Sequence, residues 1–131
     1  MAALSGQGKA FNQTRQMFLA MNLSLANTHW TRFRGLLSLS TDDFGNGSGL
    51  WIVPCRGVHT LGMRFAIDVI YLDRALKVVD VHSAVKPWRF TPIRIRATSV
   101  LELPCHTAAE TKTQVGDTIV INLSQDRTPL P

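Results

Sequence analysis

The chain has 131 residues, of which 45% are hydrophobic and 18% charged, and this composition is typical of one globular domain rather than of a disordered chain. The formal net charge of +5 is only mildly basic, so charge alone argues against a nucleic-acid partner. Two cysteines do not make a secreted disulfide framework, and no stretch approaches the ~20 apolar residues that cross a bilayer. We expect a cytoplasmic monomer or weak dimer without a membrane span, whose partner is a protein or a small molecule.

The N-terminal part of the chain divides into an arm and a first strand. Residues 1–14 are rich in Gly, Ser, Gln and Ala and predict a flexible arm, ahead of a single domain over 15–124 and a polar tail over 125–131. Leu19, Met21, Leu23 and Leu25 alternate with Ala, Asn and Ser, which predicts a strand with these four side chains on one face.

A short helix and a loop are expected next. Thr28 can cap a helix, and Trp30, Phe33 and Leu37 fall on one helical stripe. Residues 40–49 carry turn chemistry throughout and predict a surface loop.

From residue 50 onward the chain predicts mainly strands. Apolar or β-branched runs occupy 50–53, 67–72, 77–85, 98–103 and 118–123, and the turn at 73–76 makes the second and third of these a hairpin. Thr107 and Glu110 fit a capping box, which predicts a second short helix of about two turns. We therefore predict a mainly β (α+β) fold, a compact sandwich- or barrel-like antiparallel domain with two short helices.

Three segments of the sequence resemble a known family. They are Arg32-x-Arg34-Gly35-Leu36-Leu37; the block from Ile52 to Asp73 with Pro54-Cys55, Val58-His59-Thr60, Met63-Arg64-Phe65 and Ile67-Asp68-Val69; and Val100-Leu101-Glu102-Leu103-Pro104 followed by Gly116-Asp117. In this order they resemble the bacterial and archaeal family called Domain of Unknown Function 192, over roughly residues 18 to 122. The resemblance implies a mainly β, sandwich-like fold and no agreed activity.

Cys55, His59 and Met63 are spaced by four and carry soft ligands of the kind that copper uses. On a strand this spacing spans about 13 Å, too far for one metal ion unless the loop folds back. The alternative is a buried Cys, a hydrogen-bonded His and a core Met. We expect no metal and no cofactor.

Two further hypotheses involve the cysteines. Cys55 and Cys105 each follow a strand and a proline, so neighbouring strands would bring the thiols together as a disulfide or a redox pair, which a cytoplasm would keep reduced. Alternatively, Cys55 acts as a nucleophile with His59 as its base and Asp68 as the orienting group.

Asp68 lies between Ile67 and Val69 in the most apolar predicted strand, where a carboxylate is costly unless it is paired. It either faces a pocket as an acid or base, or has a structural role. In the second interpretation, which we favour, it pairs with Arg34 or Arg64, or accepts amide hydrogen bonds near residues 59–60.

The basic stretch 86–96 interleaves cations with Trp88, Phe90 and two isoleucines. This pattern suits weak binding of single-stranded nucleic acid, but alternation over residues 93–96 equally describes an edge strand whose charges block edge pairing, which we favour.

The function that the sequence favours is a non-catalytic binding or accessory module with a cleft near residues 59–64. An enzyme, either a hydrolase or a thiol-dependent catalyst that uses His59 with Cys55 or Asp68, is the alternative. The second alternative is the nucleic-acid binding described above. The residues expected to bind the ligand are His59, Thr60, Met63, Arg64, Trp88 and Arg89.

Overall fold

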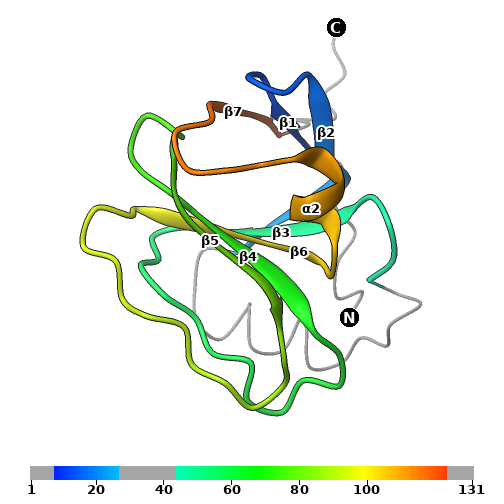
Figure 1. Ribbon diagram of the computed structural model, residues 1–131, viewed down its shortest axis with the longest axis vertical. Helices are drawn as coiled ribbons and strands as arrows, with labels where there is room; N and C mark the ends of the chain where they lie inside the picture. Colours follow the sequence, from blue (N-terminus) through cyan, green and yellow to red (C-terminus); the bar gives the residue numbers. More distant parts are fainter. Residues whose placement is uncertain (1–7, 27–43, 124–131) are drawn as a thin grey trace, which may run out of the picture.

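The computed structural model describes residues 8–26 and 44–123. Within this part of the chain, seven strands form one sheet and one short helix packs against it (Figure 1). The mainly β class predicted from the sequence is confirmed. The elements are β1 (Gly8–Asn12), β2 (Met17–Ala26), β3 (Ser48–Ile52), β4 (Ile67–Leu72), β5 (Val78–Val85), β6 (Ser99–Pro104), α2 (Thr107–Thr111) and β7 (Ile119–Asn122).

The strand order is β5-β4-β6-β3-β2-β1-β7. All neighbours are antiparallel except β2 and β3, which are parallel. The predicted hairpin is present as β4 and β5. The first predicted helix and much of the predicted loop over 40–49 lie outside the described residues. At the other end, β1 occupies part of the segment predicted as a flexible arm, so the sheet begins at Gly8.

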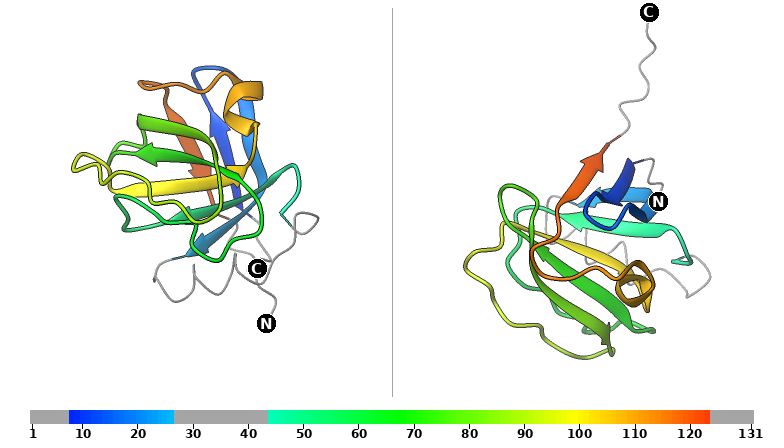
Figure 2. Two further views of the ribbon diagram at one scale, coloured as in Figure 1. Left: turned by 60° about the horizontal axis from the view of Figure 1, so that its bottom comes forward. Right: turned by 45° about the horizontal axis from the view of Figure 1, so that its top comes forward.

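The sheet curls until its two outer strands approach each other, as two further views show (Figure 2). Lys77 forms an isolated antiparallel bridge with Thr118. Beside it, Val78 donates its amide to the carbonyl oxygen of Asp117 and accepts from Gly116, both at 2.9 Å. Because these bonds join the β5 end of the sheet to the β7 end, the fold is a curled half-barrel, within the sandwich- or barrel-like class that the sequence predicts.

β2 does not keep the simple alternation predicted for it. Leu23 is buried, whereas Met21 and Leu25 are 43% and 42% exposed. The amides of Met21 and Asn22 both donate to the carbonyl oxygen of Gly47, at 2.7 and 2.8 Å, and the pairing with β1 shifts register here. This is a β-bulge, which re-aims the side chains that follow it. The prediction that all four large residues lie on one face of the strand is therefore wrong.

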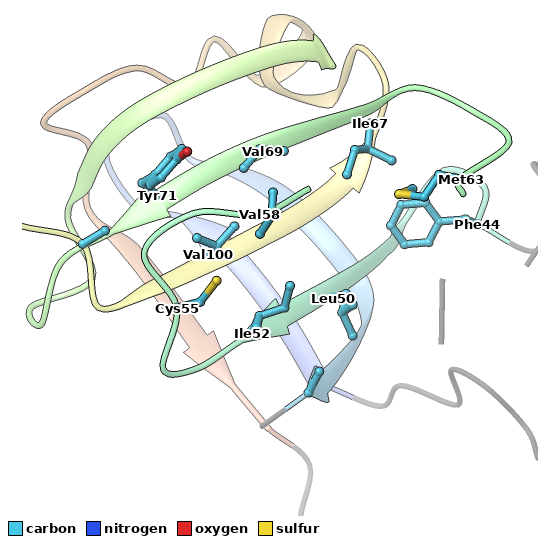
Figure 3. Packing of buried hydrophobic residues seen from close by; sticks show 12 residues of the cluster. Phe44, Leu50, Ile52, Cys55, Val58, Met63, Ile67, Val69, Tyr71 and Val100 are labelled. Carbon is cyan, nitrogen blue, oxygen red and sulfur yellow. The ribbon is translucent and has the colours of Figure 1, made fainter. Parts of the chain in front are cut away.

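The central strands β4 and β6 are buried along their whole length because both faces of the sheet are covered. One cluster of apolar residues fills the concave side of the half-barrel and includes Leu23, Ile70 and Leu101. We call the other the loop-covered cluster (Figure 3); it consists of Ala26, Phe44, Leu50, Ile52, Cys55, Val58, Met63, Ile67, Val69, Tyr71, Ala97 and Val100. The apolar residues of β4 follow the two-residue period of a strand: Ile67, Val69 and Tyr71 belong to the loop-covered cluster, and Ile70 and Leu72 to the other.

The helix α2 lies where a second helix was predicted, but the hydrogen bonds of its first turn differ from those of a capping box. The hydroxyl of Thr107 donates to the carbonyl oxygen of Pro104 at 2.7 Å. The amide of Ala108 donates to the carboxylate of Asp68 at 2.8 Å. The predicted capping box is therefore wrong, because the first-turn amide of Ala108 bonds to Asp68 on β4 and no side chain caps the helix locally.

Residues 93–96 do not form the predicted edge strand. The amide of Arg94 donates to the carbonyl oxygen of Arg56 at 2.9 Å, and the amide of Ala97 donates back to that of Arg94 at 3.0 Å, which makes a turn. Ile93 and Ile95 are 68% and 82% exposed. The alternation in the sequence therefore does not correspond to a strand with a buried face.

Candidate functional site

Two loops cover one face of the sheet and carry most of the predicted site residues. We call residues 54–66, between β3 and β4, and residues 86–98, between β5 and β6, the paired loops. They run side by side along one margin of the molecule (Figures 1 and 2). A β-bridge joins His59 to Phe90, and backbone hydrogen bonds run from Thr60 to Arg89 (2.8 Å), from Trp88 to Thr60 (2.9 Å) and from Thr91 to Val58 (2.8 Å).

Two of the six predicted ligand-binding residues point inward. Thr60 is fully buried; its hydroxyl donates to the carbonyl oxygen of Lys86 at 2.7 Å and accepts from the amide of Arg89 at 2.9 Å. Met63 is 5% exposed and lies beside Phe44 in the loop-covered cluster (Figure 3). Thr60 therefore fastens the paired loops to each other, and Met63 anchors them to the sheet.

The other four predicted residues lie at the surface. Arg64 and Arg89 are exposed, and Trp88 is 65% exposed. Trp88 has a φ of +65°, a left-handed conformation that non-glycine residues rarely adopt outside tight turns. His59 is half-buried, with its ring centroid 5.9 Å from that of Phe90, and its Nδ1 accepts from the amide of Leu61 at 3.3 Å.

Cys55 lies in the loop-covered cluster, where it is 8% exposed (Figure 3). Its thiol donates to the carbonyl oxygen of Gly57 at 3.1 Å. An open cavity of about 510 Å³ adjoins it, lined by Pro54, Cys55, Arg56, Gly57, Ile93 and Thr98. Its volume is in the usual range of ligand pockets, but its lining is not the cleft around residues 59–64 that the sequence predicts.

Gly57 is the sequence signal for this cavity. A Cβ at this position would stand 2.9 Å from the carbonyl oxygen of Pro92 and 3.0 Å from Ile93 Cδ1. A glycine that directly follows Cys55-Arg56 therefore marks the close approach of the two loops.

The two cysteines do not meet. β3 and β6 lie side by side, as the redox hypothesis requires, but they are antiparallel. The amide of Cys55 donates to the carbonyl oxygen of Thr98 at 2.9 Å, just before β6 begins, whereas Cys105 follows the end of β6. At about 3.3 Å per residue the two positions are roughly 20 Å apart along the strand. Burial raises the pKa of the Cys105 thiol, and the nearby Asp68 adds to this effect.

Asp68 is fully buried on the opposite side of the sheet from Cys55. Its neighbours Ile67 and Val69 belong to the loop-covered cluster, so its own side chain points to the other face. One carboxylate oxygen accepts the amide of Ala84 and the other that of Ala108, both at 2.8 Å. The sheet therefore separates this carboxylate from the thiol, and the structure does not assemble the Cys–His–Asp arrangement.

The three side chains of the metal hypothesis do not converge on one point. Cys55 and Met63 lie well apart in the loop-covered cluster (Figure 3). Among residues 8–26 and 44–123, no three His, Cys, Asp or Glu side chains gather closely enough to hold a metal ion.

A charged cluster that the sequence analysis missed fastens loop 86–98 to β5. The carboxylate of Asp80 bonds to Arg94 Nε at 2.7 Å and to His82 Nε2 at 2.9 Å. Burial acts to raise the pKa of Asp80, but Arg94 and His82 outweigh burial and hold the pKa below its ordinary value. Tyr71, beneath His82, donates its hydroxyl to the carbonyl oxygen of Pro92. No local motif signals the contact with Arg94, because Arg94 lies 14 positions after Asp80 in the chain.

Glu102 is a second residue that sequence analysis did not single out. It is fully buried in β6. Its cross-strand neighbours are Leu50 and Val69, so its side chain lies on the side of the loop-covered cluster. The Leu-Glu-Leu pattern of the family resemblance was the available signal.

Comparisons with known proteins give a family and a fold. The model of the family Domain of Unknown Function 192, described as "Uncharacterized ACR", matches residues 10–121. A relative named "UPF0127 protein" from Thermococcus sibiricus is 28% identical over 125 residues, which cover 92% of this chain and 79% of the relative. A relative of the same name from Pyrococcus furiosus is 40% identical over 65 residues, or 50% of this chain and 55% of the relative.

A solved structure resembles most of the fold. The crystal structure of a protein of unknown function from Novosphingobium aromaticivorans aligns with a TM-score of 0.72 at 17% identity, over 86% of this chain and 82% of the other. At this identity the likeness concerns the fold alone. In the described part of the chain, no helix combines the length and apolar character needed to cross a membrane.

Proposed function

This chain belongs to the family Domain of Unknown Function 192, and we propose that it acts as a non-catalytic binding module whose binding surface is the outer side of the paired loops. The observation that carries the proposal is the exposure of large apolar side chains on loops that backbone hydrogen bonds hold in place. Trp88 is 65% exposed and Phe90 is 74% exposed. Exposed apolar groups gathered on one surface are characteristic of interaction sites.

The rest of the site supports a binding role in two ways. His59, Arg64 and Arg89 add polar and cationic groups to the same loops. Two acidic side chains considered above are held by internal contacts, Asp68 by two backbone amides and Asp80 by Arg94 and His82. A surface with fixed apolar and cationic groups suits recognition of a partner.

A thiol-dependent enzyme is the second candidate, because the Cys55 side chain lines a cavity of about 510 Å³. In that case the ligand would contact residues 54–57 rather than Trp88 and Phe90. The two candidates therefore predict contacts at different positions on the paired loops.

Site-specific photo-crosslinking in cells tests the proposal. A benzoylphenylalanine placed at Phe90 should give discrete adducts, whereas the same group at Val115, which is 61% exposed outside the paired loops, should not. A third protein with the photo-crosslinker at Arg56, beside the cavity, reports on the enzyme candidate. Adducts at Arg56 but not at Phe90 would favour the enzyme. Adducts to protein or lipid that are equal at Phe90 and Val115, or absent at both, would overturn the binding surface.

A further inference from the structure

In the part of the chain that the structure describes, the four most exposed large apolar side chains lie in loop 86–98. Trp88, Phe90, Ile93 and Ile95 are 65%, 74%, 68% and 82% exposed. Among residues 8–26 and 44–123, the other large apolar side chains that are exposed reach 42–49%, apart from Val115 at 61%. Four such side chains within eight residues make a surface that is unfavourable in water and therefore suits a partner that removes it from water.

The same two loops carry a one-sided charge. They contain six of the 14 Lys and Arg residues and none of the nine Asp and Glu residues. One of the six, Arg94, is neutralised by Asp80 from β5. The remaining cations are exposed on the same two loops and would attract an anionic partner; they are Arg56, Arg64, Lys86, Arg89 and Arg96.

The fold holds these side chains outward, so their exposure is not a result of a loose loop. Thr91 donates its amide to the carbonyl oxygen of Val58 at 2.8 Å, and its hydroxyl accepts the Val58 amide at 2.9 Å. Pro92 is held by Tyr71, and Arg94 by Asp80 at 2.7 Å. Because the loop is ordered before binding, a partner does not have to order it.

From this surface we infer that the paired loops bind the surface of a lipid bilayer that contains anionic lipids. The inference rests on the proposed function and names its partner. The apolar side chains would enter the boundary between headgroups and acyl chains, while the cations contact phosphate groups around them. Such contact places the protein on the membrane and requires no spanning segment.

The composition of the surface favours a bilayer over a single strand of nucleic acid. Bases stack on aromatic rings, which Trp88 and Phe90 supply. Ile93 and Ile95 are at least as exposed as Trp88, but their aliphatic side chains have no flat face on which a base can stack. A bilayer boundary accepts aliphatic and aromatic side chains alike, and Trp is favoured there. The inference therefore accounts for all four exposed side chains.

The first test is sedimentation of the untagged protein with phosphatidylcholine vesicles that contain or lack phosphatidylglycerol. We expect binding to the anionic vesicles that weakens as salt is added, by roughly five-fold for each cation that contributes. The double variant Ile93→Ser/Ile95→Ser should bind at least about tenfold more weakly. The matched control Val115→Ser removes a similarly exposed side chain outside the loops and should bind as the wild type does.

Tryptophan fluorescence gives an independent measurement. Trp88 is one of three Trp residues in the chain. If it enters the bilayer, the fluorescence emission should shift to the blue when anionic vesicles are added, and the variant Trp88→Phe should lose this shift. Circular dichroism of each variant shows whether the fold is retained, and because these side chains are exposed, we expect it to be.

The outcomes separate this inference from the proposed function. Equal binding to both vesicle types, or undiminished binding by Ile93→Ser/Ile95→Ser, would overturn the bilayer as partner. Absence of vesicle binding together with protein adducts at Phe90 would also overturn it, yet leave the proposed binding surface intact. Tight binding of a single-stranded oligonucleotide without vesicle binding would assign the surface to nucleic acid, and failure of both vesicles and crosslinks would overturn both proposals.

Discussion

At the corner around Asp68, both oxygens of a fully buried carboxylate accept backbone amides at 2.8 Å, one from Ala84 on β5 and one from Ala108 on α2. In the paired loops, internal hydrogen bonds hold the backbone while apolar side chains point to solvent: Trp88 and Ile95 are 65% and 82% exposed. One region uses a polar group to connect elements inside the molecule. The other region uses its internal bonds to present apolar groups to the outside.

This difference separates structural residues from candidate functional ones. Asp68 has the features that suggest an active-site acid in a sequence, namely a carboxylate within an apolar strand. Its two amide partners give it a complete structural explanation. Ile95, in contrast, is 82% exposed and is not covered by the described part of the chain, so the explanation to be tested is a partner.

The largest effect is expected from Asp68→Ala. The change leaves the amides of Ala84 and Ala108 without their acceptor in a buried site, so the free energy of unfolding should fall by about 3 kcal/mol. Urea denaturation with circular dichroism measures it.

Asp73→Ala is the matched control for Asp68→Ala. Asp73 also accepts two backbone amides, from Ala75 and Lys77 at 2.9 Å, but in an exposed turn. Water can replace the lost acceptor there, so the loss should be about 1 kcal/mol or less. Equal losses in the two variants would break the contrast and return Asp68 to the list of functional candidates.

An intermediate effect that depends on pH is expected at Asp117. This buried carboxylate accepts from Asn12 and Arg15, both at 3.0 Å, and so connects the turn after β1 to the start of β7. Burial acts to raise its pKa, but Arg15 and Asn12 outweigh burial and lower the pKa. A carboxyl group whose pKa is lower in the folded state stabilises the fold above its unfolded pKa, and this stability is lost as the pH falls through the folded pKa.

Asp117→Asn should therefore lower the free energy of unfolding by about 2 kcal/mol near neutral pH. The gap from the wild type should narrow below a pH of about 4, where the unfolded carboxyl takes up its proton. Denaturation at a series of pH values checks this, and a gap that stays constant with pH would show that the charge of Asp117 contributes nothing.

The smallest effect on stability is expected from Ile95→Ser. The side chain is 82% exposed, so the free energy of unfolding should change by less than about 0.5 kcal/mol. Thermal denaturation measures the change. A large loss of stability would mean that Ile95 packs within the protein and has a structural role like that of Asp68.

Much of the candidate site could be predicted from the sequence, but the direction of its side chains could not. The sequence placed Trp88 and Arg89 near residues 59–64, and the backbone bonds of Thr60 join these segments. It did not reveal that Thr60 and Met63 point inward. It also missed the cavity beside Cys55, because that cavity forms only where Ile93 crosses Gly57.

The sequence by itself determined the mainly β class, the hairpin of β4 and β5, and the position of α2. These features depend on the side-chain period, β-branched runs and turn residues within short segments, which act locally. Only the tertiary structure decided that antiparallel pairing of β3 with β6 keeps Cys55 and Cys105 apart, and that Asp68 completes the first turn of α2. Contacts of this kind depend on the register and direction of strands distant in the chain, and the pattern of one segment carries no information about the segment that will lie beside it.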